Sequence, residues 1–127
     1  MVAISKPDIS TMSAISPGES RTFGVVFRRA KVGLPIVSIL YVLEEINREV
    51  CSIFGDRCIP RRLHELDLPE VFLANEPAQV ELTLVWRKGS PFPDADFANF
   101  KIHGVRVKDG KTCVLGSVTY LIPAAAR

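Results

Sequence analysis

Residues 35–54 read PIVSILYVLEEINREVCSIF, and this stretch decides the fold because its apolar residues recur at helical spacing. Pro35 suits the first turn of a helix, where its missing N–H costs nothing. Gly55 follows the last apolar residue and is a suitable C-terminal cap. We therefore predict one long helix from Pro35 to about Phe54.

The two halves of this predicted helix differ in their surfaces. Residues 36–43 are apolar nearly all round, which is typical of a helix that is buried on most sides. Further on, Ile46, Val50 and Ile53 form a single apolar stripe. Such a helix has to be enclosed by other parts of the chain, and the remaining sequence predicts strands.

Alternating apolar and polar residues mark these strands, which are expected at residues 21–29, 61–68, 78–88, 97–108 and 111–122. The clearest strand carries four large residues on one face, and we expect them in the core: Val80, Leu82, Leu84 and Trp86. A change of parity near His103-Gly104 predicts a bulge. Asp109-Gly110 predicts a two-residue hairpin turn. Short connections make consecutive strands antiparallel, so we predict an α+β fold with an antiparallel sheet of about five strands round one central helix.

The totals fit one domain of 127 residues. We expect a flexible arm over residues 1–20, which ends in a turn near Pro17-Gly18, a single domain over residues 21–123 and a tail over residues 124–127. No apolar stretch approaches the roughly 20 residues of a membrane span, so no membrane partner is expected.

The charge and the cysteine content indicate which kinds of partner and ligand to expect. A net charge of +2 is too balanced for nucleic acid to be the main partner. The basic pairs Arg61-Arg62 and Arg87-Lys88 are either solvated strand ends or a contact for phosphate or an acidic carrier protein. Three cysteines without a CxxC pair predict reduced thiols in a cytoplasmic protein, with no metal and no cofactor.

Two further stretches resemble the hotdog fold, in which a sheet curls round one central helix. ANEPAQVELTLVWR, at residues 74–87, is similar to a strand of hotdog dehydratases and thioesterases that follows a tight turn. FKIHGVRVKDGKTCVLGSVTYLIP, at residues 100–123, resembles their final hairpin. Together with the helix, the resemblance covers residues 21–122.

The resemblance implies a function. Hotdog proteins act on acyl groups held as thioesters of coenzyme A or of an acyl carrier protein, and they dehydrate 3-hydroxyacyl chains or hydrolyse the thioester. They usually form homodimers, with active sites near the helix N-termini. Unpaired N–H groups at a helix N-terminus can hold a thioester carbonyl. Here the resemblance implies that Gly33 and Leu34 bind substrate, with Lys31 as a further contact.

The sequence departs from the dehydratase pattern at one place. Those enzymes carry a His-x-x-x-Gly motif before the helix and an acid on the helix, whereas residues 29–33 read RAKVG. The usual catalytic residues therefore cannot be carried over. Either other residues perform the chemistry, or the protein binds without catalysing a reaction.

The candidate catalytic residues are Glu44, Glu45, Ser38, Tyr41 and His64. Glu44 and Glu45 point about 100° apart on a helix, so either one is buried and acts as acid or base, or both are solvated. Ser38 and Tyr41 are either core hydroxyls or donors to the acyl carbonyl. His64 is a candidate general base, with Arg62 beside it as a substrate contact.

We expect an enzyme that acts on acyl-CoA or acyl-carrier-protein substrates, dehydratase-like or thioesterase-like, and that forms a homodimer. The alternatives are a non-catalytic acyl-binding protein and an interaction or assembly protein, such as a structural component of a larger complex.

Overall fold

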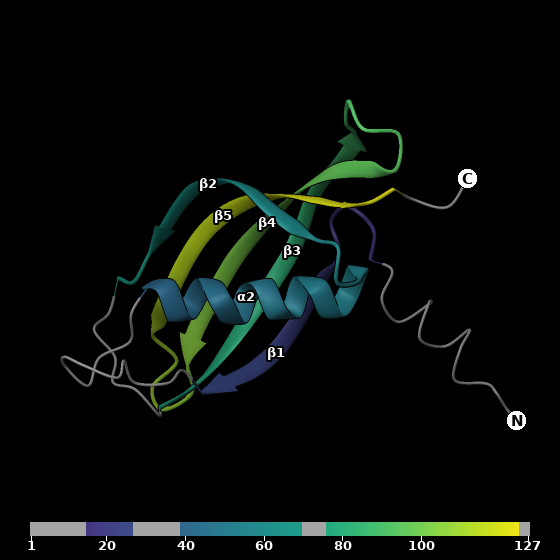
Figure 1. The fold of residues 1–127 in the computed structure, drawn as a ribbon. Coiled ribbons are helices and arrows are strands. Elements are labelled where there is room, and N and C mark those ends of the chain that lie inside the picture. Colours follow the sequence, from purple (N-terminus) through teal and green to yellow (C-terminus); the bar gives the residue numbers. More distant parts are fainter. Residues whose placement is uncertain (1–14, 27–38, 70–75, 125–127) are drawn as a thin grey trace, which may run out of the picture.

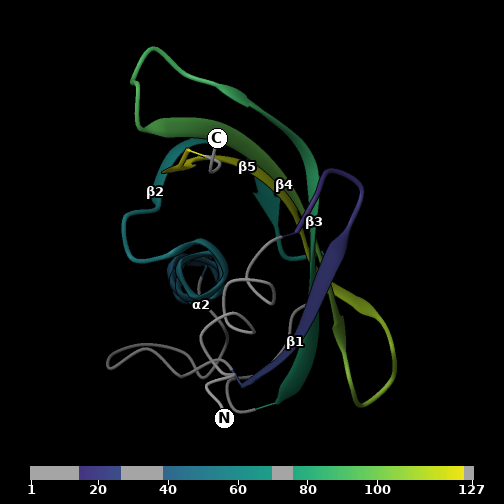
Figure 2. The ribbon, with the colours of Figure 1, turned by 90° about the vertical axis from the view of Figure 1, so that its right-hand side faces the viewer.

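The computed structural model of this chain describes residues 15–26, 39–69 and 76–124. In this part of the chain one helix, α2 (Ile39–Phe54), lies across the concave face of a curved sheet (Figure 1). Viewed almost along the helix, the sheet curls round α2 (Figure 2). The predicted α+β architecture, with a central helix and an antiparallel sheet, is confirmed.

Five described strands form the sheet in the order β1-β3-β4-β5-β2, and each neighbouring pair is antiparallel. The strands are β1 (Ser20–Val26), β2 (Ile59–Asp67), β3 (Pro77–Gly89), β4 (Ala95–Arg106) and β5 (Thr112–Pro123). The strands that precede and follow α2 in the sequence lie at opposite edges of the sheet. The order β1-α2-β2 therefore takes the chain from one edge to the other, with α2 on the concave face.

The core lies between α2 and the concave face. Val42, Ile46 and Val50 on α2 are fully buried, as their helical spacing predicts. The sheet opposes them with buried residues from alternate positions of its three central strands: Val80, Leu82, Leu84, Ala98, Phe100, Ile102, Val118, Tyr120 and Ile122. Phe100 is central, because its ring centroid lies 5.9 Å from that of Phe54 and 5.8 Å from that of Tyr120.

Two predicted turns are present. α2 ends at Phe54, where Gly55 has a φ of 104° and donates its N–H to Cys51 O at 2.7 Å. Before β1, Glu19 N donates to Ser16 O at 2.9 Å, and Gly18 takes a φ of 91° that favours glycine.

Several predicted boundaries shift by about two residues. β2 begins at Ile59 instead of residue 61, and β4 begins at Ala95 instead of residue 97. Across the loop before β4, Ser90 Oγ donates to Ala95 O at 2.8 Å.

The hairpin between β4 and β5 is longer than predicted. Arg106 N donates to Lys111 O at 2.9 Å, which closes a loop of four residues in place of the predicted two. Gly110 in this loop has a φ of 71°. The predicted bulge near residues 103–104 is confirmed by a register shift between Gly104 and Val105.

The start of α2 is less enclosed than the sequence predicts. Ile39 is 42% exposed and Leu40 is 74% exposed. The sheet covers one side of α2, and Leu40 lies on the solvent side with Glu44 and Arg48, at i+4 spacing. Within the described residues, no helix is long and apolar enough to cross a membrane.

Candidate functional site

The predicted site residues fall into two groups. Four of them lie outside the described residues: Lys31, Gly33, Leu34 and Ser38. The other five have described positions, on α2 or on β2: Tyr41, Glu44, Glu45, Arg62 and His64.

The three predicted residues on α2 lie on two sides of the helix. Tyr41 and Glu45 are four residues apart, share one flank and are partly buried. Glu44 faces solvent, with 60% of its side chain exposed against 23% for Glu45. Arg48 Nη1 donates to Glu45 Oε1 at 2.8 Å, and its Nη2 lies 3.6 Å from Glu44 Oε1. Glu45 is therefore the more enclosed acid, and an arginine holds it.

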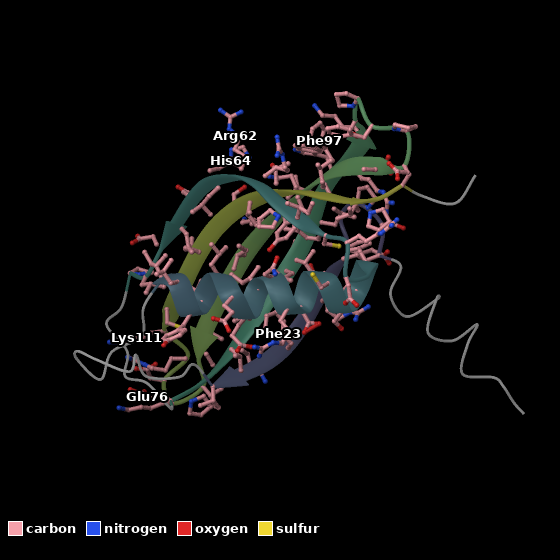
Figure 3. All side chains as sticks on the ribbon, in the orientation of Figure 1. Phe23, Arg62, His64, Glu76, Phe97 and Lys111 are labelled. Carbon is pink, nitrogen blue, oxygen red and sulfur yellow. The ribbon has the colours of Figure 1, made fainter. Side chains whose placement is uncertain are left out.

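Strand β2 has two irregular positions, one next to the predicted site residue Arg62 and one at His64. Its register against β5 shifts at Arg61 and again at His64, and each is an extra residue without a register partner. In a regular strand, neighbouring side chains alternate between the faces. Here the two bulges bring Arg61, Arg62 and His64 to the convex face, the face away from α2. Arg62 and His64 are labelled there in Figure 3.

Strand β3 contains a third shift, at Val85. It reverses the alternation in the rest of the strand, so Trp86 does not continue the buried row that ends at Leu84. Trp86 is partly buried on the convex face with Lys88, whose Nζ lies 4.9 Å from the ring centroid. The prediction that Trp86 lies in the core is wrong, because the bulge turns it to the other face.

The same bulge turns Arg87 inward. Its guanidinium carbon lies 5.6 Å from the centroid of the Phe54 ring on α2. Its Nε donates to Asp96 Oδ2 at 2.9 Å, and its Nη2 donates to Pro123 O at 2.8 Å. Arg87 therefore ties the C-terminal end of α2 to β4 and β5, and Asp96 neutralises its charge.

The three bulges meet at one hollow of about 360 Å³, which we name the convex groove. Its lining comes from four strands and consists of Arg61, Arg62, His64, Trp86, Lys88, Phe97 and Thr119. Three of these side chains are cationic and none is acidic. Figure 3 shows Arg62, His64 and Phe97 on the same outer side of the sheet.

The floor of the convex groove is a network of hydrogen bonds. His64 Nε2 and Thr119 Oγ1 are 2.8 Å apart. Asn99 Nδ2 donates to Thr119 Oγ1 at 3.1 Å and to Ser117 Oγ at 3.2 Å. Asn99 and Thr119 are each only 7% exposed. The ring of His64 is therefore positioned by buried polar groups that are themselves hydrogen-bonded.

The chain does not bring all the predicted residues together. His64 and Arg62 lie on the convex face, whereas Tyr41 and Glu45 lie on α2 against the concave face. The second histidine, His103, pairs with Thr112 Oγ1 at 3.1 Å and lines a smaller convex hollow. Both histidines of the chain are thus on the convex face.

The cysteines lie in the core region as free thiols. Cys58 Sγ lies 3.9 Å from Val50 O, and Cys51 Sγ lies 4.0 Å from Cys58 O. Burial, with Cys51 as the next cause, raises the pKa of Cys58 to about 12, and burial also raises the pKa of Cys113. These two thiols are therefore protonated at neutral pH and are poor nucleophiles.

The remaining polar groups of the described core include the hydroxyl of Tyr120. Burial raises the pKa of Tyr120, whose hydroxyl has no hydrogen-bond partner among the described residues. In the described ranges, no group of three or more His, Cys, Asp or Glu side chains is arranged to hold a metal ion.

Sequence reasoning missed most of the convex groove. The aromatic and polar members Trp86, Phe97 and Thr119 were not expected there. Alternation predicts which face of its own strand a residue occupies, but not that β2 lies beside it. The basic pairs were a usable signal: Arg61-Arg62 and Lys88 come from two separate pairs and meet in one hollow. Arg87, the fourth member of these pairs, faces inward instead.

Comparison with known proteins identifies the fold. No protein-family model matches this sequence, and no curated protein matches it. Among solved structures, an R-hydratase from Pseudomonas aeruginosa is similar, with a TM-score of 0.65 at 11% identity over 87% of this chain and 84% of that one. A MaoC-like dehydratase from Rhodospirillum rubrum gives 0.62 at 11% identity, over 89% and 96%.

A third similar structure contains a ligand. It is a hypothetical thioesterase protein from Streptococcus pneumoniae with coenzyme A, with a TM-score of 0.61 at 5% identity over 89% of this chain and 84% of that one. At such identities the likeness concerns the fold alone. The chain has the hotdog fold, as the resemblance of its sequence implied.

Proposed function

We propose that this protein binds acyl thioesters and acts on them as a dehydratase or hydratase, or as a thioesterase. The observation that carries the proposal is the fold, which this chain shares with an R-hydratase, a dehydratase and a thioesterase protein bound to coenzyme A. The proposed substrates are thioesters of coenzyme A or of an acyl carrier protein. A cytoplasmic location is part of the proposal, and the three free thiols support it.

The proposed site lies at the N-terminal half of α2. Backbone N–H groups of Gly33 and Leu34 would hold the thioester carbonyl, with Lys31 and Ser38 nearby. The acyl chain would follow the flank of α2 that carries Tyr41 and Glu45. The partial burial of these two side chains and their i+4 spacing support this choice.

Glu45 is the proposed acid or base, and the more exposed Glu44 has the weaker case. In dehydration, a base removes the proton on the carbon next to the carbonyl, and the 3-hydroxyl leaves as water after protonation. In hydrolysis, the base takes a proton from water, the oxygen attacks the carbonyl, and the thiol leaves with a proton. Both reactions place negative charge on the carbonyl oxygen, where helix N–H donors are effective.

A homodimer is the proposed assembly. β2 is an edge strand whose outer backbone edge has no partner among the described strands, and Ile59 and Leu63 on it are 53% and 47% exposed. An exposed apolar edge favours pairing with a second chain. His64 and Arg62 could join a reaction at α2 only through such a second copy, because the sheet separates them from Glu45 within one chain.

A second candidate function is binding without catalysis. Both histidines lie on the convex face, and Arg48 holds the carboxylate of Glu45. On the concave side, the described acids Glu45 and Asp96 are each paired with an arginine, and no imidazole lies there. A protein of this kind would bind an acyl thioester saturably and leave it unchanged.

Mass spectrometry of the full chain with a panel of thioesters tests the proposal. The panel contains 3-hydroxyacyl, 2-enoyl and saturated acyl thioesters, each on coenzyme A and on pantetheine. Loss or gain of water identifies dehydratase or hydratase activity, and free acid identifies a thioesterase. Glu45→Gln should lower the rate at least tenfold, whereas Glu44→Gln is the matched control and should retain it. Binding without turnover would select the second function, and absence of both would refute the proposal.

A further inference from the structure

The convex groove is more elaborate than a solvated sheet face requires. Three separate register shifts, two in β2 and one in β3, are needed to gather its side chains. Each bulge gives up a regular backbone pairing, and bulges commonly re-aim side chains next to functional sites. All three register shifts place side chains in the convex groove, which indicates that the groove has a function of its own.

We infer that the convex groove binds a phosphorylated small molecule with a planar aromatic ring, a class whose simplest members are purine nucleotides. The inference is independent of the function proposed for the concave side. The two parts of such a ligand, phosphate and ring, correspond to two groups of side chains in the groove.

The cationic group would hold the phosphate. Arg61, Arg62 and Lys88 line the groove, and no carboxylate does. Neither arginine has an acidic partner among the described residues, in contrast to Arg48, Arg87 and Arg106. The guanidinium group matches phosphate oxygens with paired N–H donors, so two adjacent arginines on one face form a suitable anion clamp.

The aromatic group would hold the ring. Trp86 and Phe97 are partly buried in the groove, and each keeps exposed surface. Lys88 Nζ lies 4.9 Å from the centroid of the Trp86 ring, so this indole already receives a cation on its face. Aromatic side chains bind nucleobases by stacking, whatever the identity of the base.

The floor would supply hydrogen bonds to the ring edge or to a sugar hydroxyl. His64 and Thr119 are held in place by one another and by Asn99. Such prepositioned groups reduce the entropy that binding would cost. A volume of about 360 Å³ is in the range of small-molecule sites.

A nucleic acid or another large anion fits the surface less well. The net charge of the chain is only +2, and one acidic side chain, Glu65, lies on the same strand and face, next to His64 in the sequence. A long polyanion would meet that carboxylate, whereas a mononucleotide would stay inside the groove. A small ligand is therefore the better match.

Fluorescence of Trp86 measures the binding directly, because it is the only tryptophan in the chain. AMP and ADP should quench it saturably, whereas adenosine and ribose 5-phosphate, which each lack one part, should bind at least tenfold more weakly. Coenzyme A and adenosine 3′,5′-bisphosphate distinguish the source of the phosphate. If coenzyme A binds at least as well as AMP, the groove holds the nucleotide end of that carrier; if AMP binds better, the ligand is a free nucleotide.

Paired variants test the site. Arg61→Ala combined with Arg62→Ala should weaken AMP binding at least tenfold, and Phe97→Ala should weaken it about fivefold or more. Lys101→Ala removes a cation from the same face outside the groove and should leave binding unchanged. Circular dichroism of each variant confirms that it is folded.

Three results would overturn the inference. The first is that no nucleotide quenches Trp86 saturably up to millimolar concentration. The second is that Lys101→Ala weakens AMP binding as much as the arginine variants do. The third is that a single-stranded oligonucleotide binds more tightly than AMP and that the arginine variants abolish this binding. The thioester assay is separate, so failure of the proposed enzyme activity leaves this test intact.

Discussion

The concave and convex faces of the sheet use alternate residues of the same strands, yet they are built differently. On the concave face the regular parts of the strands deliver fully buried apolar side chains such as Val80, Leu82 and Phe100 to α2. On the convex face three bulges interrupt it and gather cations, aromatic rings and a histidine. Regular alternation supplies the apolar core, whereas the interruptions gather polar and aromatic side chains outside it and, at Val85, also turn Arg87 inward onto Asp96.

The largest expected difference between the faces comes from two phenylalanines of β4. Phe100→Ala should lower the free energy of unfolding by about 3–5 kcal/mol, because it removes a fully buried ring that contacts Phe54 and Tyr120. Phe97→Ala, on the convex face, should cost about 1 kcal/mol. Urea unfolding monitored by circular dichroism measures both. Equal losses would show that the convex face also carries the stability of the fold.

The next largest difference in stability is expected between substitutions of two adjacent cations of β3, Arg87 and Lys88. Arg87→Met should cost about 2–3 kcal/mol, because it leaves Asp96, whose side chain is only 6% exposed, without the ion pair. Lys88→Met, which changes a convex residue, should change stability by less than about 0.5 kcal/mol. Thermal unfolding of the two variants side by side gives the comparison. A larger loss for Lys88→Met would contradict the placement of the bulge at Val85.

A smaller effect is expected where β2 joins the sheet. A Cβ on Gly116 would lie 2.8 Å from Glu65 O and 2.9 Å from Leu66 Cδ1, so Gly116→Ala should cost about 1–3 kcal/mol and push β2 outward. Gly24→Ala in β1 is the control, because its Cβ meets no described atom within 4 Å, and it should change stability by less than about 1 kcal/mol. Hydrogen exchange should rise in β2 of the first variant only, and unchanged protection there would argue against the close contact.

The smallest effect lies in the β4–β5 loop. Arg106 donates to both carboxylate oxygens of Asp109, and this lowers the pKa of Asp109 from 3.8 to about 2. The folded protein therefore binds this proton less tightly than the unfolded chain. The stabilising contribution is present above pH 3.8 and is lost as the pH falls through 2.

Asp109→Asn provides the matched control. It should remove this part of the acid dependence between pH 4 and 2 and leave the remainder of the unfolding curve unchanged. An NMR titration of the carboxyl carbon checks the pKa itself, and a midpoint near 3.8 would refute the role of Arg106.

The concave side was largely predictable from the sequence. The helical spacing of Ile46, Val50 and Ile53 and the alternation through Val80 and Leu82 each report burial directly. The exposure of Leu40 was not predictable, because helical periodicity gives the apolar side of a helix and not how far a sheet reaches round it.

The convex groove was not predictable, because a bulge depends on the partner strand. Nothing in the run Arg61-Arg62-Leu63-His64 tells which residue lacks a partner in β5. Trp86 follows an unbroken alternation in the sequence and nevertheless changes face. The buried pair Asn99 and Thr119 reads as ordinary polar strand residues until the structure brings them together.

Cys58 lies at the junction between α2 and β2, so the rate at which its thiol is alkylated can measure how often this junction opens. A thiol of pKa about 12 is ionised to only about one part in ten thousand at pH 8, so an alkylating reagent would hardly modify it in the closed state. Modification would then proceed through transient opening of this junction. Its rate, compared with that of an unfolded peptide, would give the local opening free energy at the place where helix and edge strand separate.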